Sequence, residues 1–161
     1  YYSVGSTQVL WTITDIHGNI STCTMNINVV DPENPNITCP SNITISNDLD
    51  QCSANVVVPQ PIVTDNCSVA SFFNDYNGTN SATDNYPVGA TTITWTVADI
   101  YGNTSTCSMT VTVVDDEAPE VTCPTDIAVD NDLAVCEALV TVNLPTVSDE
   151  CGIQSLSLIH I

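Results

Sequence analysis

Two segments of the chain alternate apolar and polar residues strictly, which is the pattern of a half-buried β-strand. In residues 91–98 the apolar positions are Ile93, Trp95 and Val97, with threonines between them. The apolar face of residues 104–114 is formed by Cys107, Met109, Val111 and Val113. Only a short Asp-x-x-Gly-Asn turn separates the segments, and Gly and Asn supply the positive φ angles of a tight hairpin. The pattern predicts a long hairpin with one buried face.

The same hairpin pattern occurs earlier in the chain, at a fixed interval that we call the repeat interval. Residues 4–30 repeat its Trp, Asp, Gly-Asn, Cys and Met in register, so Trp11 matches Trp95 and Cys23 matches Cys107. A constant interval of this kind indicates tandem repeats. We predict that residues 1–30 are the C-terminal strands of one repeat, 31–114 a complete repeat, and 115–161 the N-terminal strands of a third.

Shorter alternating segments precede the hairpin within residues 31–114. Strands are expected around 37–39 and at 43–45, 52–58 and 69–74. Loops are expected at 64–67 and 86–89, and a loop or short edge strand at 77–85. No segment has a helical period. Six or seven strands in a repeat of about 84 residues predict an all-β fold, an immunoglobulin-like Greek-key β-sandwich.

The charge balance excludes several classes of function. The chain is 43% hydrophobic, which is enough for a core, but it carries 19 acidic residues and no Lys or Arg, for a net charge of −19. Nucleic-acid binding and attraction to anionic lipid both need basic clusters, so both are excluded. No apolar run is long enough to insert into a membrane. Repulsion among the carboxylates must therefore be balanced by dissolved salt or bound cations.

Eight cysteines follow the same repeat. Cys23, Cys39, Cys52 and Cys67 recur one repeat interval later as Cys107, Cys123, Cys136 and Cys151. No Cys-x-x-Cys pair is present, which argues against a zinc site and in favour of disulfides in an oxidising, extracellular setting. Four cysteines per repeat allow three pairings, and the spacing does not choose among them.

Acidic residues gather in the links between repeats and at strand ends. The candidate ligands are Asp31, Glu33, Asp65, Asp99, Asn103, Asp115, Asp116 and Glu117. Carboxylate and amide oxygens are ligands that Ca²⁺ prefers, so bound calcium is predicted as the cofactor. Two alternatives remain: a solvated acidic surface, and for Asp99 a simple cap on the hairpin turn.

The sequence does not support an enzyme. His17 lies in the first hairpin turn and His160 in the C-terminal tail, and neither has a nucleophile nearby in the pattern. The paired carboxylates recur in successive repeats, which fits a tiled structural unit better than a unique cleft. The pattern Asn-x-Ser/Thr marks possible glycosylation at Asn19, Asn36, Asn42, Asn66, Asn77 and Asn103.

Four motifs together resemble the hyalin (HYR) repeat. They are ITCP at 37–40, TDNC at 64–67, YPVGATTITWTVADIYGN at 86–103 and STCSMTVTVVD at 105–115. Hyalin repeats are immunoglobulin-like extracellular modules of animal matrix proteins and of secreted surface proteins of Bacteroidetes. The motifs of this chain are most similar to the bacterial repeats. The resemblance implies a non-catalytic, adhesive role at the cell surface.

The resemblance also implies partners for the cysteines. Within repeats it pairs Cys39 with Cys107, Cys52 with Cys67, and Cys136 with Cys151, and it leaves Cys23 and Cys123 to neighbouring repeats. The expected partners are copies of the chain or adjacent repeats, arranged head to tail in a stalk or filament. The alternative is a module that binds glycans or surface proteins as part of a larger secreted protein.

Overall fold

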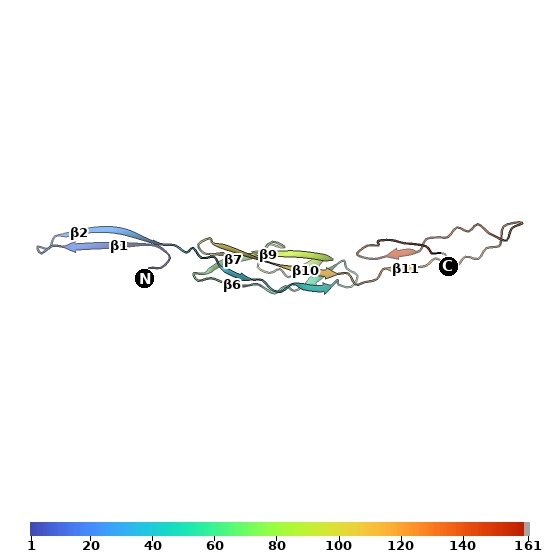
Figure 1. The fold of residues 1–161 in the computed structure, drawn as a ribbon, viewed down its shortest axis with the longest axis horizontal. Helices are drawn as coiled ribbons and strands as arrows, with labels where there is room; N and C mark the ends of the chain where they lie inside the picture. The colour runs from blue at the N-terminus through green and yellow to red at the C-terminus, as the bar shows by residue number, and fades with distance from the viewer. Residues whose placement is uncertain (160–161) are drawn as a thin grey trace. The chain divides into compact units, whose positions relative to one another are not determined.

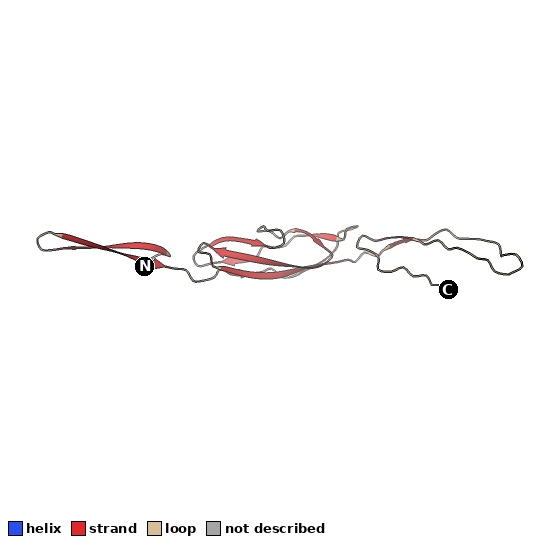
Figure 2. Ribbon diagram, turned by 90° about the horizontal axis from the view of Figure 1, so that it is seen from above, coloured by secondary structure: helices blue, strands red, loops and turns tan. Residues whose placement is uncertain are grey.

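A computed structural model of the chain describes residues 1–159, and these residues contain strands and no helix (Figure 2). The predicted all-β sandwich class is therefore confirmed. Because no helix is present in the described chain, no helical segment there could cross a membrane. Figure 1 labels the strands that have room for a label.

Strands form where β-branched residues alternate with polar ones. Their bounds are β1 Gly5–Thr14, β2 Ile20–Val29, β3 Asn36–Thr38, β4 Ile43–Ser46, β5 Ser53–Val56, β6 Ile62–Thr64, β7 Val69–Asn74, β8 Asp84–Pro87, β9 Gly89–Asp99, β10 Thr104–Val114, β11 Glu120–Thr122 and β12 Thr146–Ser148.

The contacts of the chain form two compact units. The first contains residues 1–40, 59–82 and 93–109, and the second contains 41–58, 83–92 and the chain from Thr110 onward. In the first unit β1 pairs with β2, β3 with β6, and β7 with β9, all antiparallel. Its buried side chains include Ile93, Trp95, Val97 and Met109, and the Trp95 ring lies 6.0 Å from that of Phe72.

In the second unit β5 pairs with β8 and β11 with β12, both antiparallel, while β4 runs parallel to the C-terminal part of β10. Its buried apolar side chains are Ala54, Val56, Val58, Tyr86, Val111 and Val113. Apart from Tyr86, these residues and those of the first unit occupy the inward positions that the alternation predicts.

Among the described residues, two short strands were not predicted as such, although a short edge strand was one of two alternatives for residues 77–85. β8 includes Tyr86 and Pro87, where a turn was expected, because Tyr86 is fully buried and pairs with Ala54 of β5. β6 begins directly after Pro61 and is three residues long. β6 is too short to show an alternating pattern, so its position as a strand depends on its pairing with β3.

The β1–β2 hairpin matches β9–β10 in sequence but not in surroundings. β9 and β10 lie in a four-stranded sheet of order β4-β10-β9-β7, whereas β1 and β2 pair only with each other among the described strands (Figure 1). The outcome is visible at the repeated tryptophan, since Trp95 is 0% exposed and Trp11 is 61% exposed. The apolar face of the first hairpin is therefore uncovered.

Candidate functional site

Three of the predicted calcium ligands come together in the first unit. One side-chain oxygen from each of Asp31, Asp65 and Asp99 lies within 4.8 Å of the others. Asp31 follows β2, Asp65 directly follows β6, and Asp99 is the last residue of β9. The fold thus brings the link between repeats, the Thr-Asp-Asn-Cys loop and the hairpin turn to one place.

Asp99 is 3% exposed and organises the hairpin turn. Its Oδ1 accepts hydrogen bonds from the backbone amides of Tyr101 and Asn103, each at 2.8 Å, and its Oδ2 accepts one from Asn103 Nδ2 at 2.7 Å. The predicted capping role is therefore present. It does not exclude a ligand role, since the same carboxylate faces Asp31 and Asp65.

Asp31 and Asp65 each use one carboxylate oxygen locally and leave the other without a partner. Asp65 Oδ2 accepts from the amides of Cys67 and Ser68, both at 2.8 Å, while Asp31 Oδ1 accepts from the Glu33 amide at 3.1 Å. The remaining oxygens, Asp31 Oδ2 and Asp65 Oδ1, are buried and have no hydrogen-bond partner among the described residues. An uncompensated carboxylate oxygen away from water is costly, so this arrangement favours a cation.

Asn103 ties the cluster to the link between repeats. Its Nδ2 donates to the backbone carbonyl of Asp31 at 3.0 Å as well as to Asp99. Burial by itself raises the pKa of the Asp99 carboxyl, but hydrogen bonds from Asn103, Tyr101 and Gly102 outweigh it and leave this pKa below its ordinary value. Asp99 is therefore charged at neutral pH, as a metal ligand must be.

The Cys67 thiol lies beside these carboxylates. Its interaction with the Asp31 carboxylate raises the pKa of the Cys67 thiol to about 11, with further contributions from burial and from the negative charges of Asp31, Asp65 and Asp99. This perturbation has the same origin as the proposed ion affinity, namely several carboxylates with no basic side chain near them.

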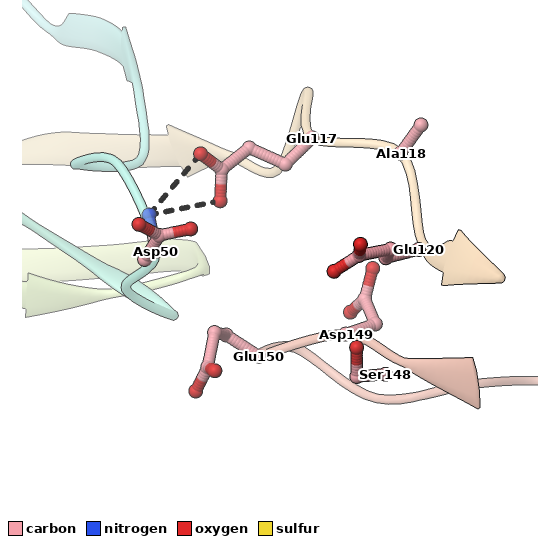
Figure 3. Close-up of a pocket in the computed structure, with 7 residues that line it drawn as sticks. All are labelled: Asp50, Glu117, Ala118, Glu120, Ser148, Asp149 and Glu150. Atoms are coloured by element: carbon pink, nitrogen blue, oxygen red, sulfur yellow. Dashed lines mark hydrogen bonds between the residues drawn. The ribbon is translucent and has the colours of Figure 1, made fainter. Parts of the chain in front are cut away.

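The other predicted ligands lie elsewhere. Glu33 is exposed, and only its backbone amide contacts the cluster. Asp116 Oδ2 accepts a hydrogen bond from Ser46 Oγ at 2.6 Å, and Asp115 Oδ1 accepts one from the Glu117 amide at 3.2 Å. The Glu117 carboxylate accepts from the Asp50 amide at 3.2 Å (Figure 3).

Glu117 lines a second acidic pocket, contained in the second unit. The pocket is also lined by Asp50, Ala118, Glu120, Ser148, Asp149 and Glu150. Figure 3 shows the carboxylates of Glu120 and Asp149 projecting into the same space. Sequence reasoning missed this group, although the repeat interval maps Asp65 onto Asp149 and could have found it.

The described residues contain two disulfides. Cys39 is bonded to Cys107, as the resemblance implied, with 5.8 Å between their Cα atoms. Cys52 is bonded to Cys151, with 4.9 Å between Cα atoms. The expected pairs Cys52–Cys67 and Cys136–Cys151 are therefore absent, and the free thiols are those of Cys23, Cys67, Cys123 and Cys136.

The observed bond explains why Cys52 and Cys67 are not paired. A cysteine forms one disulfide, and Cys52 is bonded to Cys151 within the second unit. Val88 donates to the carbonyl of Cys52 in that unit, whereas Ile100 donates to the carbonyl of Ser68 in the first unit.

The remaining predicted residues lie mostly at the surface. Asn19, Asn36, Asn42 and Asn66 are exposed, and Asn77 and Asn103 are half-buried. The Nδ2 atom of Asn103, to which a glycan would attach, is engaged by Asp31 and Asp99. His17 is exposed, and His160 lies outside the described residues.

The chain is similar in sequence to known proteins over almost its whole length. The chain is 32% identical over 161 residues to hyalin of Lytechinus variegatus, and the match covers 97% of this chain and 30% of that protein. It is 35% identical over 163 residues to hyalin of Strongylocentrotus purpuratus, and that match covers 97% of this chain and 13% of that protein. The chain thus spans less than a third of each relative.

The family comparison matches the HYR domain at residues 30–113. This match confirms the family resemblance that the cysteine and hairpin motifs indicate. Modules of this family are of an extracellular, adhesion-type and non-catalytic kind. The chain therefore belongs to the HYR domain family.

Proposed function

We propose that this chain is a segment of an extracellular stalk or filament, in which HYR repeats join head to tail and calcium binds at the boundaries between repeats. The role is structural and adhesive. The observation that carries the proposal is the uncovered apolar face of the β1–β2 hairpin, where Trp11 is 61% exposed. The disulfides support an oxidising, extracellular location.

The uncovered hairpin needs strands from another repeat. An isolated pair of strands is at best marginally stable in water, and an apolar patch of this kind marks an interaction surface. The equivalent hairpin, β9–β10, is flanked by β4 and β7. We infer that strands equivalent to β4 and β7 from a preceding repeat flank β1 and β2 in the same way.

The C-terminal part of the chain offers the complementary half. β11 and β12 match β3 and β6 at the repeat interval, and no hairpin follows them in the described residues. Residues 115–161 thus correspond to the opening strands of a repeat and residues 1–30 to its closing hairpin, and in the array each half is completed by the other half from its neighbour. Such a contact joins two different surfaces and extends into a filament instead of closing as a dimer.

Self-association with burial of Trp11 tests this proposal. As the protein concentration rises, we expect the sedimentation coefficient to increase and acrylamide quenching of tryptophan fluorescence to fall. Trp95 is fully buried, so the quenchable signal comes from Trp11, and Trp11→Ala serves as the control that removes it. A chain that stays monomeric, with Trp11 quenchable at every concentration, contradicts head-to-tail joining.

The calcium proposal rests on the cluster of Asp31, Asp65 and Asp99. Their charges repel one another at this separation, and two of their buried oxygens have no partner among the described residues. The chain has no Lys or Arg to neutralise them. Ca²⁺ accepts carboxylate oxygens in irregular geometry, which suits ligands from a link, a loop and a turn. Asp115 and Asp149 match Asp31 and Asp65 at the repeat interval, so we expect them to contribute ligands to an equivalent ion at the next boundary.

Removal of calcium is expected to lower the thermal stability of the chain. At free Ca²⁺ about 100 times the dissociation constant, binding stabilises the folded state by about 2.7 kcal/mol. For a domain of this size that corresponds to a melting temperature roughly 10 °C or more above the value in chelator at equal ionic strength. The measurement is calorimetry on dilute, monomeric protein with Ca²⁺ or with chelator.

The chain offers a matched pair of variants for this test. Asp15 makes the same turn bonds as Asp99, because it accepts hydrogen bonds from the amides of His17 and Asn19. Among the described residues, however, Asp15 does not belong to a cluster of carboxylates. Asp99→Asn should therefore remove most of the calcium-dependent shift, and Asp15→Asn should leave it unchanged. Equal shifts in both variants, or none in the unmodified chain, contradict the site.

A further inference from the structure

We propose that each repeat is covalently bonded to its neighbour through its second and third cysteines, so that Cys67 and Cys136 form disulfides with the corresponding cysteines of a preceding and a following HYR repeat. This inference rests on the proposed head-to-tail array, and it names the cysteines that link neighbouring repeats covalently. In assemblies of this chain the predicted bond joins Cys136 of one copy to Cys67 of the next.

The Cys52–Cys151 disulfide is the observed example of this bond. Cys52 is the second cysteine of the central repeat, and Cys151 is the third cysteine of the repeat that follows. The bond therefore crosses a repeat boundary, with 4.9 Å between the Cα atoms. By the repeat interval, Cys67 corresponds to Cys151 and Cys136 corresponds to Cys52.

Cys67 is held in the same local frame as Cys151. The β3–β6 and β11–β12 ladders match pair by pair: Asn36↔Thr64 with Glu120↔Ser148, Ile37↔Val63 with Val121↔Val147, and Thr38↔Ile62 with Thr122↔Thr146. Beyond each ladder the cysteine amide donates to the aspartate two residues before it, at 2.8 Å from Cys67 to Asp65 and at 2.9 Å from Cys151 to Asp149. The frame that presents a bonded cysteine in one copy thus presents an unbonded one in the other.

Cys136 is likewise held by the turn that holds Cys52. The amide of Asp48 donates to the carbonyl of the residue after Cys52 at 2.8 Å, and the amide of Asp132 does the same after Cys136 at 2.7 Å. Each aspartate also accepts a hydrogen bond from the amide seven residues further on, at 3.0 and 3.2 Å. The two ends of the predicted bond therefore repeat the two ends of the observed one.

The assignment pairs every cysteine of the chain. Cys39–Cys107 and Cys52–Cys151 form within one copy. Between copies, Cys123 and Cys23 occupy the positions of Cys39 and Cys107, while Cys136 and Cys67 occupy those of Cys52 and Cys151. Each boundary between repeats is then crossed by the backbone. It is also crossed by one disulfide, which joins the second cysteine of one repeat to the third cysteine of the next.

Formation of the bond needs an oxidant, which a disulfide-bearing molecule supplies by exchange. The thiolate of one cysteine attacks the oxidant's disulfide and forms a mixed disulfide, with release of one oxidant thiolate. The thiolate of the second cysteine then displaces the other half of the oxidant. The two cysteine thiols have together lost two electrons and two protons, and the oxidant's disulfide has taken them up to become two thiols.

The test is peptide mapping of the full chain after equilibration in a buffer of reduced and oxidised glutathione. Trypsin has no site because Lys and Arg are absent, so cleavage before aspartate, which separates the relevant cysteines, is used. We expect covalent multimers in which the Cys67 peptide is linked to the Cys136 peptide. Cys136→Ser should abolish this link and leave Cys67 as a thiol or glutathione adduct, while Cys52–Cys151 persists. Cys67→Ser should do the same to Cys136.

The outcomes separate this inference from the array itself. Multimers joined through Cys23 and Cys123, with Cys67 linked to Cys52 or left unlinked to another repeat, overturn the second-to-third assignment and leave head-to-tail assembly standing. Monomers in which Cys23, Cys67, Cys123 and Cys136 are all unlinked to another copy overturn both.

Discussion

Trp95→Ala is expected to destabilise the central repeat by about 3 to 5 kcal/mol, the range for removing a large buried aromatic side chain. Trp95 is fully buried, packs near Phe72, and lies on the inward face of β9 with Ile93 and Val97. The deletion leaves a cavity that a sheet held by a disulfide cannot easily close. Urea unfolding followed by circular dichroism measures the loss as a lower midpoint.

Trp11→Ala is the matched control, because the two tryptophans occupy the same position of the repeat. Trp11 is 61% exposed in the single chain, so we expect a change within about 0.5 kcal/mol for the dilute monomer. Trp95→Phe should fall between them, since the indole Nε1 of Trp95 has no hydrogen-bond partner among the described residues to lose. Similar losses for both alanine variants would mean that Trp11 is covered in the monomer.

Replacing Cys39 and Cys107 together by serine is expected to cost about 4 kcal/mol of stability. The disulfide closes a chain segment of 68 residues, and the chain-entropy model gives about this value for a loop of that length. The bond joins the residue after β3 to the middle of β10, so without it these two segments lose their covalent connection. The measurement is the urea midpoint of the double variant against that of the oxidised parent.

A control for this double variant is available in the same chain. Cys23 and Cys123 are exposed free thiols in the described monomer, and replacing both by serine is expected to leave the midpoint unchanged at low concentration. Reduction of the parent with excess phosphine, which also breaks Cys52–Cys151, should lower the midpoint at least as much as Cys39→Ser with Cys107→Ser. An unchanged midpoint after reduction would assign the stability of the repeat to packing alone.

The fold class and the hairpins could be predicted because they depend on local alternation. The alternation of apolar and polar residues predicts buried side chains at four positions, and all four are buried: Ile93, Trp95, Val97 and Met109. β6 and the strand character of Tyr86 could not be predicted, because both depend on pairing with distant segments and not on their own pattern. The uncovered state of Trp11 has the same origin, since its sequence signal equals that of Trp95 and only the neighbouring strands differ.

The candidate site was predicted in part. Asp31, Asp65 and Asp99 were singled out as separate acidic positions, and only the fold brings them within 4.8 Å. The Cys52–Cys151 bond was missed because pairing was considered within repeats, whereas the third cysteine of each repeat lies next to a boundary. A repeat interval reports which residues are equivalent, but it does not report which equivalents touch.

The position of Cys39 and Cys107 near opposite ends of the repeat's sequence has a mechanical consequence. When the repeat is pulled at its termini, tension passes through the disulfide, and of the 68 residues between the cysteines only those leading to the Cys52–Cys151 bond can share it. At roughly 3.5 Å per extended residue, about 240 Å of contour length per repeat stays hidden until the bond is reduced. A tether built from such repeats is nearly inextensible in an oxidising environment, and a reductant converts the same tether into a long elastic chain.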